Sequence, residues 1–441
     1  MDQLPRKLGL LDATLIVIGI VIGSGIFLLP NVIARSLPSG FAIIAVWVVA
    51  GVLSYFGALA YAELGAMMPD TGGQYVYLRE AFGPLWGFLG GWVITLAVVP
   101  GGTAFLAVGF SIYLDHFIPL THWMRQVVSL ALVAVLSAAN YIGIQEGAWI
   151  QRIFTTLKIM GLALVIGAAA FAPHVAGGPA ISARPLSYSG FGLAMTACLM
   201  AYNGWSYVSF VAGEVRDPQR NLPRSLALGM VAVIALYVCA NLAYMNVMTV
   251  PEIAATERVG ATAAGRALGP AGATVLSAVV LLSVIGAMNG SILTGARIPF
   301  AEARDGVFYS RFGRIHPRFQ TPAFAIVAQG LWTEALILTG SYESLFAYSI
   351  LSAWIFYTLS VVAVWVLRRK APDAPRPYRM WGYPFTLWAF VIVSVWFMVD
   401  ALANQFKTSL MALAITAAGI PFYLIWRVRD GRRPPDSGTL S

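Results

Sequence analysis

The chain has 441 residues, of which 59% are hydrophobic and only 11% are charged. Soluble globular proteins carry about 25% charged residues, so this composition excludes that class and indicates an integral membrane protein. The formal net charge of +9 does not indicate nucleic-acid binding, because the basic residues gather in segments that alternate with apolar runs.

The hydrophobic residues form long runs, and about 20 apolar residues are enough for a helix to cross a bilayer. The pattern predicts about twelve spans. They lie near residues 12–36, 40–67, 84–116, 124–143, 149–172, 190–213, 223–249, 270–298, 322–340, 344–367, 381–402 and 408–427. We therefore expect an all-α integral membrane protein, followed by a short, polar, disordered tail at about 430–441.

The basic residues are distributed unequally between the two sides that these spans create. With the N-terminus in the cytoplasm, the outer side holds only Arg35, Arg125, Arg184, Arg258, Arg266 and Lys407. This asymmetry follows the positive-inside rule, so we expect a multi-pass protein of the plasma (inner) membrane with both termini cytoplasmic. Arg6 and Lys7 precede the first apolar run, as in a signal peptide, but no small-residue cleavage site follows.

The first span is interrupted near its middle by Gly23-Ser24-Gly25. Two glycines allow the backbone to leave the helix and allow a ligand to approach bare N–H groups. Such groups are tolerated at membrane depth only where they line a cavity, so the break indicates a binding site. The alternative is a close helix–helix contact through small residues.

Lys158 lies about two turns inside the fifth span. A lysine within the membrane marks a functional site by default, unless its side chain extends to the interface. Two functions are open: the ammonium group occupies the place of a sodium ion, or it exchanges a proton during transport.

The sixth span is interrupted by Asn203-Gly204-Trp205. Asn203 can bond a polar ligand group or cap a half-helix, and Tyr202 and Trp205 can form the wall of a side-chain pocket. The alternative is that these rings only pack within the bundle or lie at the interface, although a mid-span position disfavours the interface. Paired breaks in corresponding halves of a hydrophobic chain are typical of a transporter's substrate site.

Breaks in spans one and six predict two five-span repeats of inverted topology, at about 12–172 and 190–367, followed by two extra helices at about 381–427. The whole chain, 1–441, would then be a single permease domain. Helix N-termini at the breaks suit a carboxylate, and helix C-termini with unwound carbonyls suit an ammonium group or a cation. An α-amino acid carries both charges, as do other zwitterions.

Further candidates lie close to the breaks in sequence or in the neighbouring spans. Met200, just before the second break, and Tyr237, in the seventh span, are candidate pocket walls or gates, although both residue types are ordinary packing residues. Asn289-Gly290-Ser291 interrupts the eighth span, where it can face the cavity, bond to Lys158, or make a plain interhelical hydrogen bond. Ser206 would complete a pocket that suits small or medium neutral side chains.

Acidic residues are scarce in the spans. Asp12, Glu63 and Glu214 lie toward cytoplasmic span ends, where we expect them to pair with arginines as gate or loop anchors. None lies at mid-depth, which argues against a carboxylate-based sodium site or proton relay.

The chain offers no signature of an enzyme. Its two cysteines, Cys198 and Cys239, fall inside apolar spans, where we expect two buried free thiols. No metal-ligand spacing, phosphate-binding loop or nucleophile elbow occurs in a suitable context. We therefore expect no catalytic residues, no metal and no cofactor.

The chain resembles the L-amino-acid transporter (LAT) family of the amino acid–polyamine–organocation (APC) superfamily over essentially all spans. The resemblance is carried by Gly23-Ser24-Gly25-Ile26-Phe27, Pro69 to Trp92, AYNGWSYVSFVAGEVRDPQRNLPRSL from Ala201 to Leu226, AMNGSILTGARIPFAEARDG from Ala287 to Gly306, and PYRMWGYP from Pro377 to Pro384. It implies a LeuT-type fold with 5+5 inverted repeats, helices 1 and 6 unwound, and sodium-independent amino acid transport, usually by exchange.

The resemblance also implies roles for particular residues. The family's unwound backbone holds the substrate, which corresponds here to Ile22, Gly23, Ser24, Gly25 and Ile26 and to Ala201, Tyr202, Asn203 and Gly204. The family's lysine that replaces a sodium site falls on Lys158. Its bulky gate, often aromatic, falls on Met200, and its seventh-span pocket aromatic on Tyr237.

Animal members of the family are joined to a glycoprotein partner through a cysteine in the outer loop between spans three and four. Here that loop, 115–125, contains no cysteine, so we expect a bacterial-type carrier without a disulfide-linked heavy chain. The expected partners are an amino acid substrate and the lipid bilayer, and no nucleic acid.

We therefore expect an obligatory exchanger of neutral L-amino acids that works by alternating access. The closest alternative is a proton-coupled uptake carrier of amino acids or amines with the same fold. A non-transporting amino acid sensor is disfavoured because the chain has no long soluble domain, and an ion channel because no filter motif is recognisable.

Overall fold

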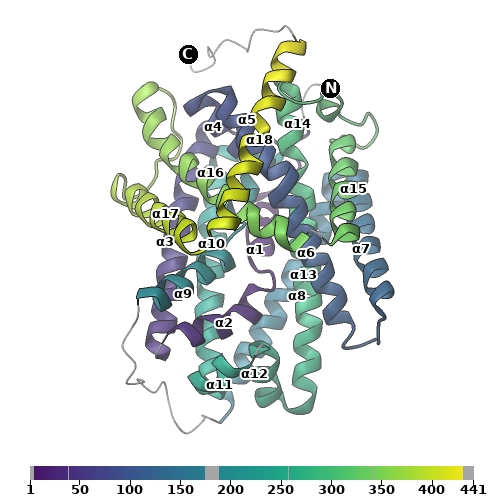
Figure 1. Cartoon of the computed structure of the whole chain (residues 1–441), viewed down its shortest axis with the longest axis vertical. Helices are drawn as coiled ribbons and strands as arrows, with labels where there is room; N and C mark the ends of the chain where they lie inside the picture. The colour runs from purple at the N-terminus through teal and green to yellow at the C-terminus, as the bar shows by residue number, and fades with distance from the viewer. Residues whose placement is uncertain (1–3, 38, 174–187, 257, 341, 431–441) are drawn as a thin grey trace.

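The computed structural model describes residues 4–37, 39–173, 188–256, 258–340 and 342–430, which leaves the predicted disordered tail outside the described residues. These residues form a bundle of helices, and the N- and C-termini lie at the same end of it (Figure 1). The first half contains α1 (Leu10–Val21), α2 (Gly25–Ser36), α3 (Gly40–Met67), α4 (Gln74–Phe82), α5 (Pro84–Val93), the π-helical turn η1 (Ile94–Val98), α6 (Val99–Leu114), α7 (His122–Ile142) and α8 (Ile144–Phe171).

The second half is also built from helices. It contains α9 (Tyr188–Ala201), the 3-10 helix η2 (Trp205–Glu214), α10 (Pro218–Val247), α11 (Val250–Ala255), α12 (Val259–Leu268), η3 (Gly269–Ala271), α13 (Gly272–Gly295), α14 (Arg297–Arg304), η4 (Ser310–Gly313), α15 (Ala323–Thr339), α16 (Tyr342–Lys370), α17 (Phe385–Asn404) and α18 (Phe406–Asp430).

The helices account for the predicted spans. Within the described residues, nine helical stretches are long and apolar enough to cross a bilayer, and α1 and α2, bent by 43° at their break, form a tenth. The remaining two predicted spans are α9 with η2, interrupted at 202–204, and α15, an apolar helix of 17 residues. The prediction of an all-α membrane fold with unwound helices 1 and 6 is therefore confirmed.

The two breaks lie against each other. Gly204 has φ 111°, a left-handed conformation that glycine adopts without a steric penalty. A Cβ at this position would lie 2.6 Å from Cγ2 of Ile20 on α1, so glycine also permits the close approach of the two broken spans. On the other side, a Cβ on Gly25 would lie 3.4 Å from Cα of Ala201.

The broken spans are surrounded by long helices. α10 packs along both α1 and α3, and α13 packs along α8 and α6, so that the buried apolar side chains form one core. One sequence prediction is corrected here. Cys198 is buried, but Cys239 is exposed, because it lies on the face of α10 that points away from the core, where a bilayer would cover it.

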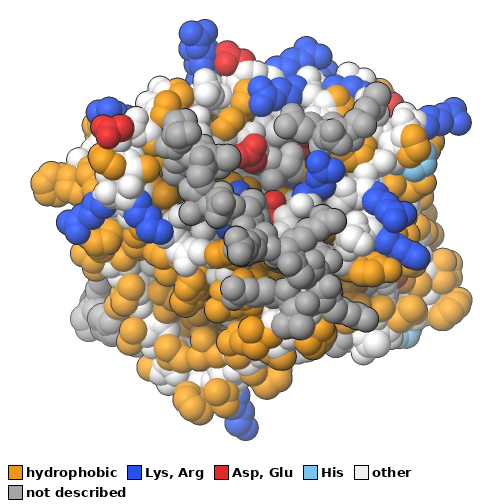
Figure 2. Space-filling model, turned by 90° about the horizontal axis from the view of Figure 1, so that it is seen from above, with side chains coloured by type: hydrophobic (Ala, Val, Ile, Leu, Met, Phe, Trp, Pro, Cys, Tyr) orange, Lys and Arg blue, Asp and Glu red, His pale blue; other side chains and the backbone are white. Residues whose placement is uncertain are grey.

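The end of the molecule that carries the termini is rich in lysine and arginine side chains (Figure 2). The N-terminal segment crosses this end, where the backbone N–H groups of Lys7 and Leu8 donate to the carbonyl oxygen of Glu214 at 2.9 and 3.0 Å. Leu8 also forms an isolated parallel β-bridge with Val215. The start of the first span is therefore joined to the end of the sixth.

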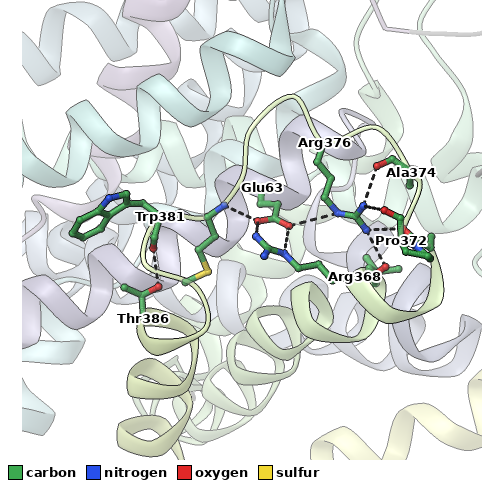
Figure 3. Close-up of polar contacts among 10 residues, drawn as sticks. Glu63, Arg368, Pro372, Ala374, Arg376, Trp381 and Thr386 are labelled. Atoms are coloured by element: carbon green, nitrogen blue, oxygen red, sulfur yellow. Dashed lines mark hydrogen bonds and ion pairs between the residues drawn. The ribbon is translucent and has the colours of Figure 1, made fainter.

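A second connection at this end centres on Glu63, near the end of α3 (Figure 3). Arg368 of α16 donates two hydrogen bonds to its carboxylate at 2.9 and 2.7 Å, and the backbone N–H of Met380 donates a third at 2.6 Å. Arg376 lies 3.7 Å from the same carboxylate and donates to four backbone carbonyl groups around the end of α16. The cluster fixes α3 to α16 and to the segment that leads into α17.

At the opposite end, the short helices α11 and α12 lie beside α2 (Figure 1). The side-chain amide of Asn31 on α2 lies within hydrogen-bond distance of the carbonyl oxygens of Ile253, Ala254 and Thr256, at 3.3, 2.9 and 2.6 Å. Because the last carbonyls of a helix have no intrahelical donor, this contact caps α11 and holds the helical segment on α2.

Candidate functional site

The site is built around a tyrosine that joins the two breaks. The hydroxyl group of Tyr237, fully buried on α10, lies 2.9 Å from the carbonyl oxygen of Val21 and 3.1 Å from that of Ala201. These carbonyls belong to the last residues of α1 and α9. The carbonyl oxygen of Val21 also accepts from the N–H of Gly23 at 2.9 Å, so the hydroxyl group adds a donor where both helices end. Tyr237 was predicted as a pocket wall or gate, and the structure places it as a connection between the breaks.

Lys158 holds the first break from its other side. Its ammonium group donates to the carbonyl oxygens of Gly19, Ile22 and Ser283 at 2.8, 2.7 and 2.9 Å, which uses its three donors. The side chain is 1% exposed, so it does not extend to the membrane interface. Carbonyl groups at the end of a half-helix suit an ammonium group or a cation.

Ser283 on α13 completes this contact. Its hydroxyl group donates within 2.8 Å of the carbonyl oxygen of Ile22 and 3.1 Å of that of Gly23. The backbone at the break is therefore fixed by α8 and α13 together, and the residues that remain partly exposed are Gly23, Ser24 and Gly25. They lie at the N-terminus of α2, where backbone N–H groups lack intrahelical acceptors and suit an anion, and Ser24 borders an open space.

That open space is a cavity of about 500 Å³. It begins at Ser24 and Phe27, passes between Leu106 of α6 and Val284 of α13, and ends near Asp115, His116 and Arg258, at the end of the molecule away from the termini. Most of the wall is apolar, which suits a neutral side chain, and its charged groups lie only at the mouth.

Asn203 and its neighbours occupy the other side of the breaks. Asn203 is partly exposed, and its side-chain oxygen accepts a hydrogen bond of 3.0 Å from the hydroxyl group of Tyr357. Ala201, Tyr202 and Gly204 are buried. Tyr202 donates to the carbonyl oxygen of Trp47 at 3.2 Å.

The aromatic residues proposed as walls of a side-chain pocket do not line this cavity. Tyr202 packs against Trp47 and Tyr237, and Trp205 packs against Tyr61 and Tyr357. Tyr202 thus contacts the first half of α3, and Trp205 contacts the second half, which leads toward Glu63. Met200 is partly buried and Ser206 fully buried, and neither belongs to the cavity wall.

The polar interruption of the eighth span forms interhelical hydrogen bonds. Asn289 accepts from Asn140 of α7 at 2.9 Å and donates to Gln151 of α8 at 3.0 Å. Neither Asn289 nor Ser291, which is buried, is among the hydrogen-bond partners of Lys158 in the described residues. The hydrogen-bond alternative is therefore the one the structure contains, and the proposed bond from Asn289 to Lys158 is absent from that set.

The three acidic residues are paired with arginines, as predicted. Asp12 pairs with Arg152, and Glu63 with Arg368. Glu214 and Arg297 form two hydrogen bonds of 2.7 and 3.0 Å, and both side chains are fully buried. All three pairs lie on the side of the breaks nearer the termini, where every residue of η2 except Gly213 is buried.

Comparison of the whole chain with known proteins identifies its family. The amino acid permease family model matches residues 8–420. The serine/threonine exchanger SteT of Bacillus subtilis (strain 168) is 32% identical over 428 residues, covering 96% of this chain and 97% of its own length.

This chain belongs to the amino acid permease family.

Animal relatives of the permease show the same sequence identity over a smaller share of their own length. The human b(0,+)-type amino acid transporter 1 is 32% identical over 386 residues, covering 86% of the permease and 79% of its own length. The rat large neutral amino acids transporter small subunit 2 is 32% identical over 441 aligned positions, covering 96% and 81%. The permease is thus a multi-pass membrane transporter of amino acids in the LAT family of the APC superfamily, and not an enzyme.

Sequence reasoning missed several residues that hold the site. Gln151 and Thr155 share one face of α8 with Lys158, and Gln151 donates to the carbonyl oxygen of Leu15 on α1 at 3.3 Å. Their spacing of three and four residues within an apolar span was the available signal. Ser283 carried no such signal, because a single serine in an apolar helix is ordinary.

Proposed function

We propose that the permease exchanges neutral L-amino acids across the plasma membrane without sodium, by alternating access. The observation that carries this proposal is the ammonium group of Lys158 on the carbonyls of Gly19 and Ile22, because a fixed cation there leaves no room for a mobile one. The relative named a serine/threonine exchanger supports exchange as the mode of transport.

We infer that the substrate lies between the two breaks. Its carboxylate would meet the N–H groups at Ser24, Gly25 and Ile26, and its ammonium group would meet Ala201, Tyr202, Asn203 and Gly204, at the carbonyl end of α9. Ile22 and Gly23 would complete the binding backbone. The apolar wall at Leu106 and Val284 favours neutral side chains, because a charged side chain there would lose its water without gaining a partner.

Further roles follow from the same proposal. Lys158 would couple binding to the movement of the first span, while Asn289 and Ser291 would support α13 from behind. Residues predicted as pocket walls or gates would contact the substrate when the half of the bundle nearer the termini opens; these are Met200, Trp205, Ser206 and Tyr237. The basic end would be cytoplasmic, and the segment 115–125, which lacks cysteine, would leave the permease without a disulfide-linked heavy chain.

Purified permease in proteoliposomes tests exchange. Labelled serine or leucine is added outside vesicles that contain either unlabelled amino acid or buffer, with and without sodium and a pH gradient. Exchange predicts uptake only into preloaded vesicles, unaffected by sodium. Accumulation driven by a proton gradient in empty vesicles would instead support the proton-coupled carrier. Competition by the common amino acids then defines the accepted side chains.

A further inference from the structure

One buried carboxyl group differs from all the others. The described residues contain four buried acidic side chains: Asp12, Glu63, Glu214 and Glu302. The first three are bonded to arginine. Glu302, on α14, is fully buried, and neither of its oxygens has a hydrogen-bond partner in the described part of the chain. A buried polar group without a partner requires a physical explanation.

The carboxyl group is packed against the backbone of α5. Its Oε1 atom lies only 2.2 Å from the position that a Cβ at Gly91 would take, so only glycine leaves room for it. The helix passes at Ile94 into the π-helical turn η1, which also contacts α14. Such turns are rare and occur frequently at functional sites.

The charges around α14 do not neutralise Glu302. Arg297 on the same helix is held by Glu214 of η2, and Arg79 on α4 pairs with Glu80 and Asp305. Asp305 also accepts a hydrogen bond of 2.6 Å from the hydroxyl group of Tyr75.

Other titratable groups on α14 and on the elements packed against it are Tyr77 on α4, Tyr207 on η2, Arg304 on α14, Arg311 on η4 and Glu334 on α15. Helices α5 and α13 and the turn η1 carry none. Asp305 lies close enough to Glu302 to oppose a second negative charge.

An ionised carboxylate in this position would lack water, a hydrogen-bond donor and a counter-charge. The neutral carboxyl group avoids most of that penalty. A metal ion is not indicated as the counter-charge, because no three metal-ligating side chains come together in the described residues.

We propose that Glu302 is a proton-binding site of the permease: it holds a proton while the half of the bundle nearer the termini is packed, and releases it to water when that half opens. This rests on the proposed alternating access. The proton goes to water and returns from water, so no other reactant is needed. Acid would then favour the packed conformation. The equilibrium constant for opening would increase by up to tenfold per pH unit while the group titrates, because one proton is released on opening.

A cysteine reporter measures this opening without substrate. Ser209, on η2, is 1% exposed and lies between the breaks and the end that carries the termini. The S209C reporter is placed in a C198A/C239S background, and its reaction with a methanethiosulfonate reagent is followed in detergent between pH 5 and 8. The same reporter is combined with E302Q. The ionisation of the thiol changes both rates in the same way, so its effect cancels in the ratio of the two rates.

The ratio of labelling rates, Glu302 protein over E302Q, is expected to rise with pH, because the glutamine cannot lose a proton. A ratio that stays constant across this range overturns the proposal. E252Q, which alters a carboxylate at the opposite end of the molecule, is the matched control and should keep the pH dependence of the parent.

D305N provides an independent test, which keeps the proposal testable if E302Q does not fold. Removing the neighbouring negative charge should move the midpoint of the labelling profile to lower pH, and an unchanged midpoint contradicts the assignment.

Exchange in proteoliposomes separates the two proposals. A parent protein that exchanges no amino acid at any pH contradicts the proposed function, whereas normal exchange with a constant labelling ratio contradicts only the role of Glu302.

Discussion

The ammonium group of Lys158 lies 2.7 Å from the carbonyl oxygen of Ile22, the C-cap residue of the first helix. Lys158 comes from α8, far along the chain from α1. The contact holds the glycine-rich break of the first span in one position against α8. Its removal gives the first prediction.

Lys158→Ala should reduce exchange more than tenfold. Three carbonyl oxygens lose a charged donor, and a hydrogen bond to a charged group contributes about 1.5–3 kcal/mol. Exchange of labelled amino acid in proteoliposomes provides the measurement. Lys407→Ala, which changes an exposed lysine on α18, is the control and should leave the rate unchanged. Equal rates for the two variants would remove Lys158 from the mechanism.

Tyr237→Phe should lower both exchange and thermal stability. The ring remains, but the hydroxyl group that joins the carbonyls of Val21 and Ala201 is lost, at a cost of about 1–3 kcal/mol. Tyr244→Phe is the matched control, because Tyr244 lies on the same helix, is equally buried, and its hydroxyl group has no hydrogen-bond partner among the described residues. If both variants behave alike, the connection between the breaks is unimportant.

Arg297→Leu should destabilise the permease by about 3–5 kcal/mol, because the carboxyl group of Glu214 would remain buried without its partner. Arg266→Leu, which breaks the partly exposed pair with Glu252, should change stability by no more than about 1 kcal/mol. Thermal unfolding in detergent compares the two. A similar loss for both would mean that burial does not set the strength of the pair.

Gly204→Ala should abolish exchange, because the new Cβ would force the second break away from Ile20 on α1. Gly83 offers a matched control. It also has a positive φ, 100° against 111° for Gly204, but a Cβ there would meet no atom within 4 Å. Gly83→Ala therefore carries the backbone strain without the clash, and it should retain most of the exchange activity. Retained activity in Gly204→Ala would show that the close approach is not required.

The sequence was sufficient to predict the spans, the two breaks and the fact that the acidic residues pair with arginines. Length and hydrophobicity decide a membrane helix, and Gly204 or Gly25 weakens one regardless of its surroundings. Lys158 was recognisable because a lysine in an apolar span is costly wherever it points.

Contacts between distant helices could not be predicted in the same way. The direction of a side chain around its helix decides that Cys239 faces outward and that Trp205 packs on Tyr61 instead of lining the cavity. Nothing in an apolar run reveals that Ser283 lies beside Ile22, because the two residues meet only after α1 and α13 have packed. Glu302 escaped notice because its lack of a partner is a property of the packed structure.

The bridge between Leu8 and Val215 has a mechanical consequence. Tyr237 joins the first and sixth spans at their breaks, and Leu8 joins them again at the end near the termini. Because the two attachments lie at different distances from that end, they hold α1 and η2 together along their length. Neither of these two half-helices can then tilt without the other. Under the proposed alternating access, opening toward that end would require both half-helices to tilt together, and an affinity tag fused close to Leu8 would hinder this motion more than one placed at the C-terminus.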